Sequence, residues 1–244
     1  MIFDKIIAND KCCCRDVSWR ISAMTMLLLL ISSFSLTAQN KTDWGMVKVV
    51  ECQKQLSDKW MIGVKEDLRV DHNFSHYSRS KTTLSADYKF VRYGIKLGTG
   101  FDFINKYTGK HIYRNRYRFS LNASYKYVYR NWEFGYRMRF LTMFHDERTG
   151  YYNYEPEYNW RNKLSVSYQR RFSRFKYSLS GETYSAFNRD KRLKLSDLVF
   201  EGSVEYRLTR RQFLSFYVKD YRDIYIDSDQ IRTVYIGLGW RYKH

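Results

Sequence analysis

The sequence predicts an all-β fold, a transmembrane up-and-down antiparallel β-barrel of about ten strands, with ten to twelve as the range. Three observations predict it. Apolar and polar residues alternate with a period of two, the alternating segments are long, and short turns alternate with longer polar loops. A period of two is typical of a strand whose two faces meet different surroundings. A tilted strand that crosses a membrane needs roughly nine to eleven residues, against about five or six in a soluble sheet.

The first element along the chain is an export signal. The apolar run Met24–Leu36 follows Arg15 and Arg20, and small or polar residues come directly after it. This order is typical of a signal peptide, and the run is too short for a membrane-spanning helix. We expect residues 1–39 to be a signal peptide, with a start codon inside this region as the alternative, and residues 40–244 to form the outer-membrane β-barrel domain.

The composition allows two different classes of protein. The chain carries 43 Lys and Arg against 25 Asp and Glu, a net charge of +18, and 18% of its residues are aromatic. Such a chain attracts polyanions, and cations interleaved with aromatics also suit a binder of single-stranded nucleic acid. The export signal and the strand period favour a membrane protein, so we expect no nucleic-acid partner. Cys52 is the one cysteine outside the leader, which excludes an internal disulfide in the mature chain.

Ten alternating segments fall between Lys59 and Lys243. In the fourth, the odd positions from Tyr113 to Tyr127 are mainly aromatic or apolar, and the even positions carry cations or small polar groups. In order, the segments cover about 60–70, 84–90, 93–103, 113–127, 132–140, 160–168, 175–187, 198–208, 214–218 and 234–242.

The connections between these segments alternate in length. Short turns are expected at 89–92, 129–131, 170–174 and 208–211. Longer polar loops are expected at 71–79, 105–111, 144–158, 188–194 and 223–230. Short turns on one side and long loops on the other are typical of an outer-membrane barrel, and an even strand count places both chain ends on the short-turn side.

Two features do not fit this count. Residues 44–54 also look extended, and they could be an eleventh strand, an inner strand, a short periplasmic piece or part of a twelve-strand barrel. As an eleventh strand they would begin on the long-loop side. Glu66 falls on the apolar face of its segment, where a charge near the middle of the membrane is costly.

The polar face of the segments should line the interior of the barrel, because lipid surrounds the outside. We expect a lumen lined by Lys65, Asp67, Arg69, Asp87, Lys96, Asp102, Arg114, Arg116, Arg118, Glu133, Arg137, Arg139, Arg161, Lys163, Glu182, Glu201 and Glu205. Ion pairs between these side chains would largely plug a narrow barrel. Cations exceed anions in this set, so a bound anion or a weak small-anion pore is a second hypothesis.

An outer-membrane barrel enzyme acting on lipid or surface glycan is the alternative function. Acyl transfer would need a serine activated by a histidine. The histidines fall in expected loops or at the end of the chain, and none belongs to a recognisable motif: His72, His76, His111, His145 and His244. We therefore predict a protein that is not an enzyme, with no catalytic residues, no metal site and no cofactor.

Two stretches carry a resemblance to known barrels. The last residues, "VYIGLGWRYKH", resemble the terminal strand that the barrel-assembly machinery reads. The stretch Asp43–Arg69, with its early Trp44, its "LSDKW" turn and the strand from Glu66 to Arg69, resembles a bacterial outer-membrane barrel family, the domain of unknown function 2490. The resemblance implies the fold and a location in the cell outer membrane, and it implies no activity.

The expected partners follow from this location. Loop cations would meet lipopolysaccharide phosphates at the outer leaflet. Solubilising loop charge is the alternative reading for Lys106, Lys110, Arg148, Arg189, Lys191, Arg192 and Lys194. We expect membrane lipid, lipopolysaccharide and the barrel-assembly machinery as partners of a monomer.

Overall fold

A computed structural model describes residues 42–107, 113–145, 156–187, 193–224 and 232–244. Within these ranges it contains eleven strands and one short 3-10 helix, η2 (Val91–Tyr93), and no described helix is long or apolar enough to cross a membrane. The strands are β1 (Thr42–Gln55), β2 (Trp60–Asp71), β3 (His76–Phe90), β4 (Ile95–Tyr107), β5 (Tyr113–Tyr129), β6 (Trp132–His145), β7 (Glu157–Tyr168), β8 (Phe175–Phe187), β9 (Leu193–Arg207), β10 (Gln212–Asp223) and β11 (Arg232–Lys243).

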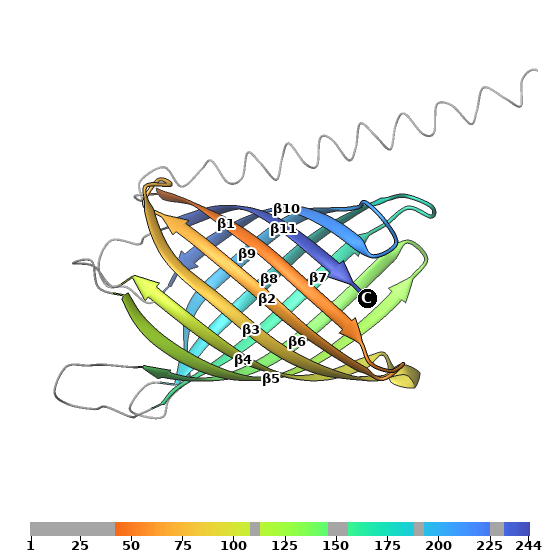
Figure 1. Ribbon diagram of the computed structural model, residues 1–244, viewed down its shortest axis with the longest axis horizontal. Helices are drawn as coiled ribbons and strands as arrows, with labels where there is room; N and C mark the ends of the chain where they lie inside the picture. The colour runs from red at the N-terminus through yellow and green to blue at the C-terminus, as the bar shows by residue number, and fades with distance from the viewer. Residues whose placement is uncertain (1–41, 108–112, 146–155, 188–192, 225–231) are drawn as a thin grey trace, which may run out of the picture. The chain divides into compact units, whose positions relative to one another are not determined.

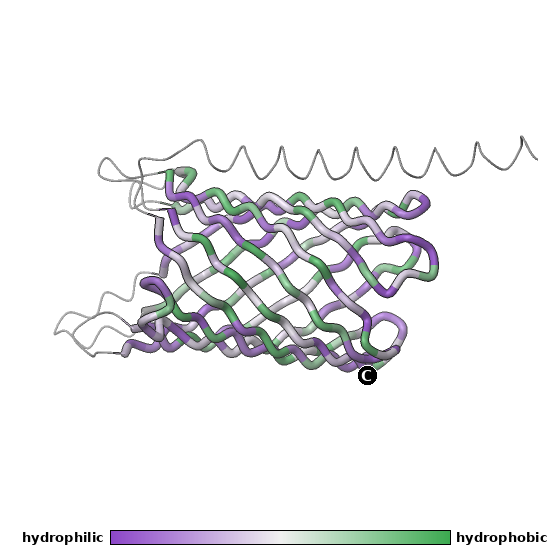
Figure 2. The backbone as a smooth tube through the Cα atoms, turned by 90° about the horizontal axis from the view of Figure 1, so that it is seen from above, coloured by the Kyte–Doolittle hydropathy of each residue, from purple (hydrophilic) through white to green (hydrophobic). Residues whose placement is uncertain are grey.

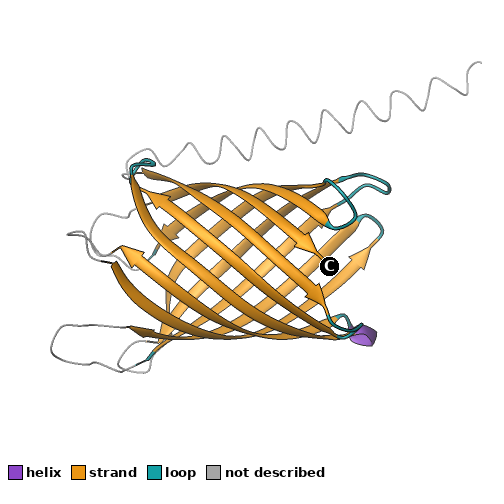
Figure 3. Cartoon of the chain, in the orientation of Figure 1, coloured by secondary structure: helices purple, strands orange, loops and turns teal. Residues whose placement is uncertain are grey.

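The strands close into one barrel. Each strand from β1 to β11 pairs with its neighbours in sequence in antiparallel fashion, and β1 pairs with β11 to complete the ring (Figures 1 and 3). This last pair is parallel, with Thr42 opposite Arg232 and Gln53 opposite Lys243. His244 extends the seam, because its amide donates to the Gln53 carbonyl and its own carbonyl accepts from the Gln55 amide.

The predicted fold class is confirmed, and the structure specifies the number of strands. The expected count of ten began at Lys59 and left out β1. Residues 42–55 are the eleventh strand, not an inner strand or a separate periplasmic piece. An odd number of strands places Thr42 at the long-loop end and His244 at the short-turn end, so the expectation that both ends share the short-turn side is wrong.

One connection is much shorter than expected. The segment 71–79 was expected to be a long loop, but the β2–β3 ladder continues to Asp71 opposite His76, leaving a four-residue turn at 72–75. His72, Asn73 and Phe74 all have φ between 53° and 65° there. The Asp43 carboxylate accepts hydrogen bonds from the amides of His72 (3.2 Å) and Asn73 (2.9 Å), which fixes this conformation.

The two faces of the sheet differ as the period predicts. Hydrophobic and hydrophilic residues alternate along the strands (Figure 2). On β5, Phe119 and Leu121 are 45% and 51% exposed, whereas Arg118 and Ser120 between and beside them are 8% and 5% exposed. The apolar residues therefore form the outer surface. An exposed apolar surface that surrounds the whole barrel is what a hydrocarbon solvent requires and what water disfavours.

Aromatic pairs reinforce both ends of this outer surface. Trp60 and Tyr88 lie with ring centroids 5.0 Å apart near the short turns, as do Trp132 and Tyr168. Other cross-strand aromatic pairs lie near the long-loop end, among them Tyr107–Tyr113 and Phe140–Tyr158. Rings at these two levels match the aromatic girdles that flank the apolar band of membrane barrels.

A small apolar cluster of Val47, Tyr217 and Tyr235 lies on the inner face next to the seam. Two glycines make room for its rings. A Cβ atom at Gly45 would lie 2.6 Å from the Tyr235 ring, and one at Gly237 would overlap the Tyr217 ring. The tyrosines therefore fill space that a side chain would otherwise take, and they tie β10, β11 and β1 together at the point of closure.

Candidate functional site: the charged interior

Ion pairs between strands that are not neighbours identify the inner face of the barrel. Side chains of strands two positions apart can meet only on the concave side of a closed sheet. Arg137 on β6 contacts Glu182 on β8 at 3.2 Å, and Lys176 on β8 contacts Glu133 on β6 at 2.9 Å. Residues that share the alternation of these side chains along each strand face the same interior.

Most of the charged residues expected in the lumen form ion pairs there. The Asp102–Arg118 pair is the most buried, with 4% and 8% of the residues exposed. Arg118 Nε donates to Asp102 Oδ2 at 2.6 Å, and Thr83 donates to the other carboxylate oxygen at 2.6 Å. The expected residues with a described ion-pair partner are Asp67, Asp87, Lys96, Asp102, Arg118, Glu133, Arg137, Lys163, Glu182, Glu201 and Glu205.

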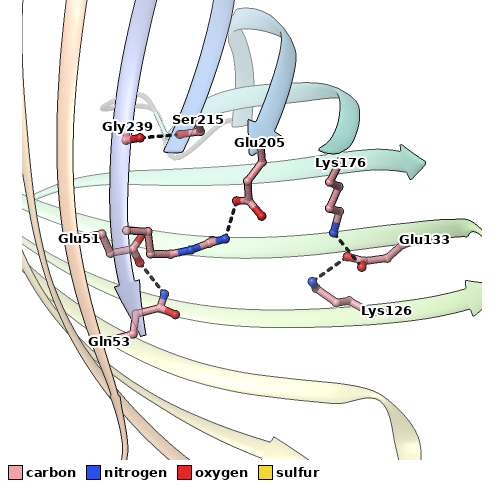
Figure 4. A network of polar contacts seen from close by, with 9 residues as sticks. Glu51, Gln53, Lys126, Glu133, Lys176, Glu205, Ser215 and Gly239 are labelled. Atoms are coloured by element: carbon pink, nitrogen blue, oxygen red, sulfur yellow. Dashed lines mark hydrogen bonds and ion pairs between the residues drawn. The ribbon is translucent and has the colours of Figure 1, made fainter. Parts of the chain in front are cut away.

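The network near the short turns links several strands (Figure 4). Glu133 accepts from Lys126 at 2.7 Å and from Lys176 at 2.9 Å, so one carboxylate joins β5, β6 and β8. Arg241 of β11 pairs with Glu205 of β9 across the intervening β10. These contacts cross-brace the barrel wall from the inside.

The remaining expected residues are cations without a described carboxylate partner: Lys65, Arg69, Arg114, Arg116, Arg139 and Arg161. Arg139 and Arg161 are Cα partners on β6 and β7, so two like charges lie directly opposite each other. Arg139 donates to the Asn122 side chain, and the Arg161 guanidinium lies 4.0 Å from the Tyr184 ring centroid. The buried Nε of Arg161 has no hydrogen-bond partner. This pair is thus a place where two interior cations meet with no described carboxylate bound to either of them.

Several interior charges were absent from the sequence prediction. Arg79 and Lys81 bind Asp67, at 4.0 Å and 3.4 Å. Arg79 ends the expected loop 71–79, and Lys81 lies between that loop and the expected segment 84–90. Lys219 binds Glu201 at 3.2 Å. Lys219 and Lys176 lie on the polar face of their segments, so alternation alone could have found them. Arg79 and Lys81 had no such signal, because the outer positions beside them are Ser80 and Thr82.

A cavity of about 740 Å³ opens at the short-turn end, between the β5–β6 and β7–β8 turns. Its lining includes Trp132 and one carboxylate, Glu133, which is already shared by two lysines. Five cations line it: Arg130, Arg170, Arg171, Lys176 and Arg207. The cavity therefore concentrates positive charge at one mouth of the barrel.

The part of the chain that the structure describes contains no group of three metal-ligating side chains. His72 and His76 lie with ring centroids 5.6 Å apart in the β2–β3 turn, and Ser75 Oγ is 2.7 Å from Nδ1 of His76. His111 lies outside the described residues. The turn thus contains one serine–histidine contact that the sequence analysis did not single out.

The fold defines the class as a closed β-barrel with an apolar exterior and a charged interior. No family model matches the chain, and no curated protein matches it, so membership in the domain of unknown function 2490 family stays a prediction.

Two solved structures are similar at low scores. An anion-selective porin from Comamonas acidovorans is 11% identical, with a TM-score of 0.37, over 76% of this chain and 52% of the porin. The chain thus spans about half the length of that porin. The translocator domain of the autotransporter NalP from Neisseria meningitidis is 11% identical, with a TM-score of 0.36, over 84% of this chain and 91% of that domain. At these scores neither likeness supports a function, and the fold class rests on the strand pairing.

Proposed function

We propose that the chain is a non-enzymatic barrel of the cell outer membrane, whose plugged interior binds small anions or passes them weakly. The observation that carries the proposal is the combination of a closed sheet with an apolar outer surface and an ion-paired interior. A bilayer offers no hydrogen bonds to a backbone, so a spanning sheet must close, and its outer side chains must be apolar. Its inner side chains are then free to be charged.

The preference for anions rests on the surplus of cations. Arg139 and Arg161 face each other without a carboxylate, and five cations line the cavity at the short-turn mouth. An anion between the two guanidinium groups would relieve their repulsion and accept charge-assisted hydrogen bonds. Chloride, phosphate and short carboxylates share this chemistry.

The test is the conductance of the purified, folded protein in planar bilayers under a potassium chloride gradient. We expect small currents whose reversal potential lies towards the chloride equilibrium potential. Replacing Arg139 and Arg161 together by Gln should lower the chloride preference. Replacing Arg210, which lies in the exposed 208–211 turn, by Gln is the matched control and should change nothing. A cation preference in the unchanged protein would contradict the anion proposal.

The membrane location should be tested first, in a separate experiment. Cell fractionation should place the chain with the outer membrane, and the folded barrel should migrate faster in unheated gels than after boiling. A chain that is soluble without detergent would contradict the location, whatever its conductance.

We also propose lipopolysaccharide and the barrel-assembly machinery as partners. Near the long-loop end, Asp220 on the outer face accepts from Arg222 (3.0 Å) and Arg232 (2.8 Å), so cations already cluster at this level of the barrel. Lys106 lies near the long-loop end of β4, on the inner face, opposite Arg79 and Arg114. Lys110, Arg148, Arg189, Lys191 and Arg192 lie outside the described residues, and the side chain of Lys194 is not described. Phosphate-free lipopolysaccharide should then bind the purified barrel more weakly than the phosphorylated form.

An enzyme acting on lipid or surface glycan remains the second candidate. The one observation in its favour is the contact between Ser75 and His76, because a serine activated by histidine performs acyl transfer. Labelling by a fluorophosphonate probe, lost in Ser75→Ala and retained in Ser78→Ala, would support it. Absence of labelling in the folded barrel would remove this support.

A further inference from the structure

Three polar side chains on the neighbouring strands β1, β2 and β3 interrupt the apolar outer face near its middle: Lys48, Glu66 and Thr82. Each is the seventh residue of its strand, β1, β2 or β3. Lys48 has Leu68 and Leu238 as its Cα partners, and these are 40% and 43% exposed on the outer surface. The three polar residues therefore lie outside the barrel, far from both of its ends.

A charge at this depth is costly in lipid and is rarely kept without a partner. Among the described residues Glu66 has one partner, a neutral one, since Thr82 Oγ1 donates to its Oε2 at 2.6 Å. Lys48 is exposed, and its ammonium contacts no acceptor among the described residues. Lys48 and Glu66 are diagonal neighbours on one face, because Glu66 is the Cα partner of Val50, but they form no ion pair with each other.

The tilt of the strands places these two charges at similar depth. Lys48 lies two residues nearer the long-loop end of β1 than Val50 does. Crossing from β1 to β2 at right angles also moves towards the long-loop end (Figure 1). Both Glu66 and Lys48 therefore lie nearer the long-loop end of the barrel than Val50 does. Around the circumference of the barrel, Val50 lies between the two charges.

We propose that the outer faces of β1 and β2 form a two-fold interface between two copies of this chain. A two-fold axis along the membrane normal keeps every residue at its depth in the membrane. If residue i of one subunit contacts residue j of the other, then residue j of the first subunit also contacts residue i of the second. Lys48 then pairs with Glu66 of the partner subunit, and Glu66 pairs with Lys48 of the partner subunit. Each charge acquires its counter-ion inside a protein contact instead of in hydrocarbon.

The apolar residues around the pair suit such a contact. Val50, Leu68 and Leu238 are exposed and surround the two charges with aliphatic surface that can pack without a polar cost. The surface is thus complementary to itself in charge, and its apolar surroundings suit a contact made within hydrocarbon, where charged residues pair with one another. The sequence favoured a monomer, and this self-complementary patch is the observation against that expectation. The inference rests on the proposed membrane location.

Val50 gives a direct test because it lies close to the two-fold axis. In a Cys52→Ser background, Val50→Cys should form an intermolecular disulfide under mild oxidation in lipid. Leu164→Cys in the same background is the matched control, because Leu164 is an outward residue of β7, 65% exposed, away from β1 and β2. It should give at least tenfold less cross-linked dimer.

Charge exchange tests the pairing itself. Lys48→Glu and Glu66→Lys, each alone, place like charges together across the interface and should reduce cross-linking at Val50→Cys at least tenfold. Chains carrying one change each should cross-link with each other when mixed, and a chain carrying both changes should cross-link with itself. Lys54→Glu, an outward residue near the end of β1, should leave cross-linking unchanged.

The outcomes separate this inference from the membrane location. A barrel with heat-modifiable mobility that stays monomeric in nanodiscs, with no Val50→Cys cross-link, overturns the interface and leaves the location intact. That result would mean that lipid or an internal Lys48–Glu66 pair satisfies the charges. Cross-linking that ignores the charge exchanges overturns the pairing. Loss of heat-modifiable mobility in the unchanged protein speaks against the membrane barrel itself.

Discussion

Arg139 and Arg161 face each other across the β6–β7 ladder on the inner wall of the barrel, with no described carboxylate bound to either of them. Like charges directly opposite each other destabilise an antiparallel pair, whereas favourable cross-strand pairs contribute roughly 0.2–1 kcal/mol. Each guanidinium group has a compensating contact: Arg139 donates a hydrogen bond to the Asn122 side chain, and the Arg161 guanidinium lies over the Tyr184 ring. We expect an anion bound between the two guanidinium groups to offset this repulsion and stabilise the fold.

Removing one of the two charges should therefore change both stability and its dependence on anions. We expect Arg139→Gln to raise the free energy of unfolding slightly in anion-poor buffer, by less than about 1 kcal/mol. The unchanged protein should gain stability when sulfate or phosphate is added at constant ionic strength, and Arg139→Gln should gain less. Urea unfolding in lipid vesicles measures both effects, and equal gains in the two proteins would contradict the anion site.

The Asp102–Arg118 pair should respond far more strongly. Asp102→Ala leaves the buried Arg118 guanidinium without its counter-ion, and breaking a buried pair in this way costs about 3–5 kcal/mol. Asp58→Ala, in the exposed turn after β1, is the control and should cost less than about 0.5 kcal/mol. Replacing both partners, as in Asp102→Leu with Arg118→Met, should recover most of the loss in the same unfolding measurement.

The glycine beside the seam gives a packing prediction. Gly237→Ala drives a methyl group into the Tyr217 ring, and overpacking of this kind costs about 1–3 kcal/mol. Gly181→Ala meets only ordinary contacts, 3.7 Å or more from the Phe200 ring, and should be nearly neutral. Thermal loss of the heat-modifiable gel band ranks the variants. The idea is wrong if Tyr217→Ser fails to rescue Gly237→Ala.

The β2–β3 turn should depend on a side chain from β1. Asp43→Ala removes the acceptor for the amides of His72 and Asn73, and a hydrogen bond of this kind contributes about 1 kcal/mol. We expect faster amide hydrogen exchange at these two residues and little change elsewhere. Asp43→Asn keeps one acceptor oxygen and should give an intermediate rate. Unchanged exchange in Asp43→Ala would show that the turn holds its own shape.

The sequence predicted the barrel because alternation is a local signal. On β5 every outward position from Tyr117 to Tyr127 is apolar or aromatic, so one segment is enough to reveal a strand and its two faces. The strand β1 and the first half of β3 were harder, since Lys48, Ser80 and Thr82 break the apolar face there. Where the outward residues of a strand are polar, the apolar–polar alternation is lost, and the strand cannot be recognised by that pattern.

The contacts inside the barrel depend on information that alternation does not carry. Alternation places Arg139 and Arg161 on the inner face, but only the register of β6 against β7 makes them partners. Register is set by turn lengths and by closure of the whole ring. The pairing at the seam could not be predicted for the same reason. Residues 42–55 and 232–243 are distant in sequence, and no local sequence pattern indicates that they pair.

The parallel seam separates the two ends of the barrel strands, which an even-stranded up-and-down barrel keeps on the same rim. Thr42 and His244 belong to opposite rims, so an epitope placed just before Thr42 and another placed after His244 would be reached by antibodies from opposite sides of the membrane. In intact cells only one of the two tags should stain, and permeabilisation should reveal the other. Labelling the two tags on one chain in two colours would thus report the orientation in which the barrel is inserted in the membrane.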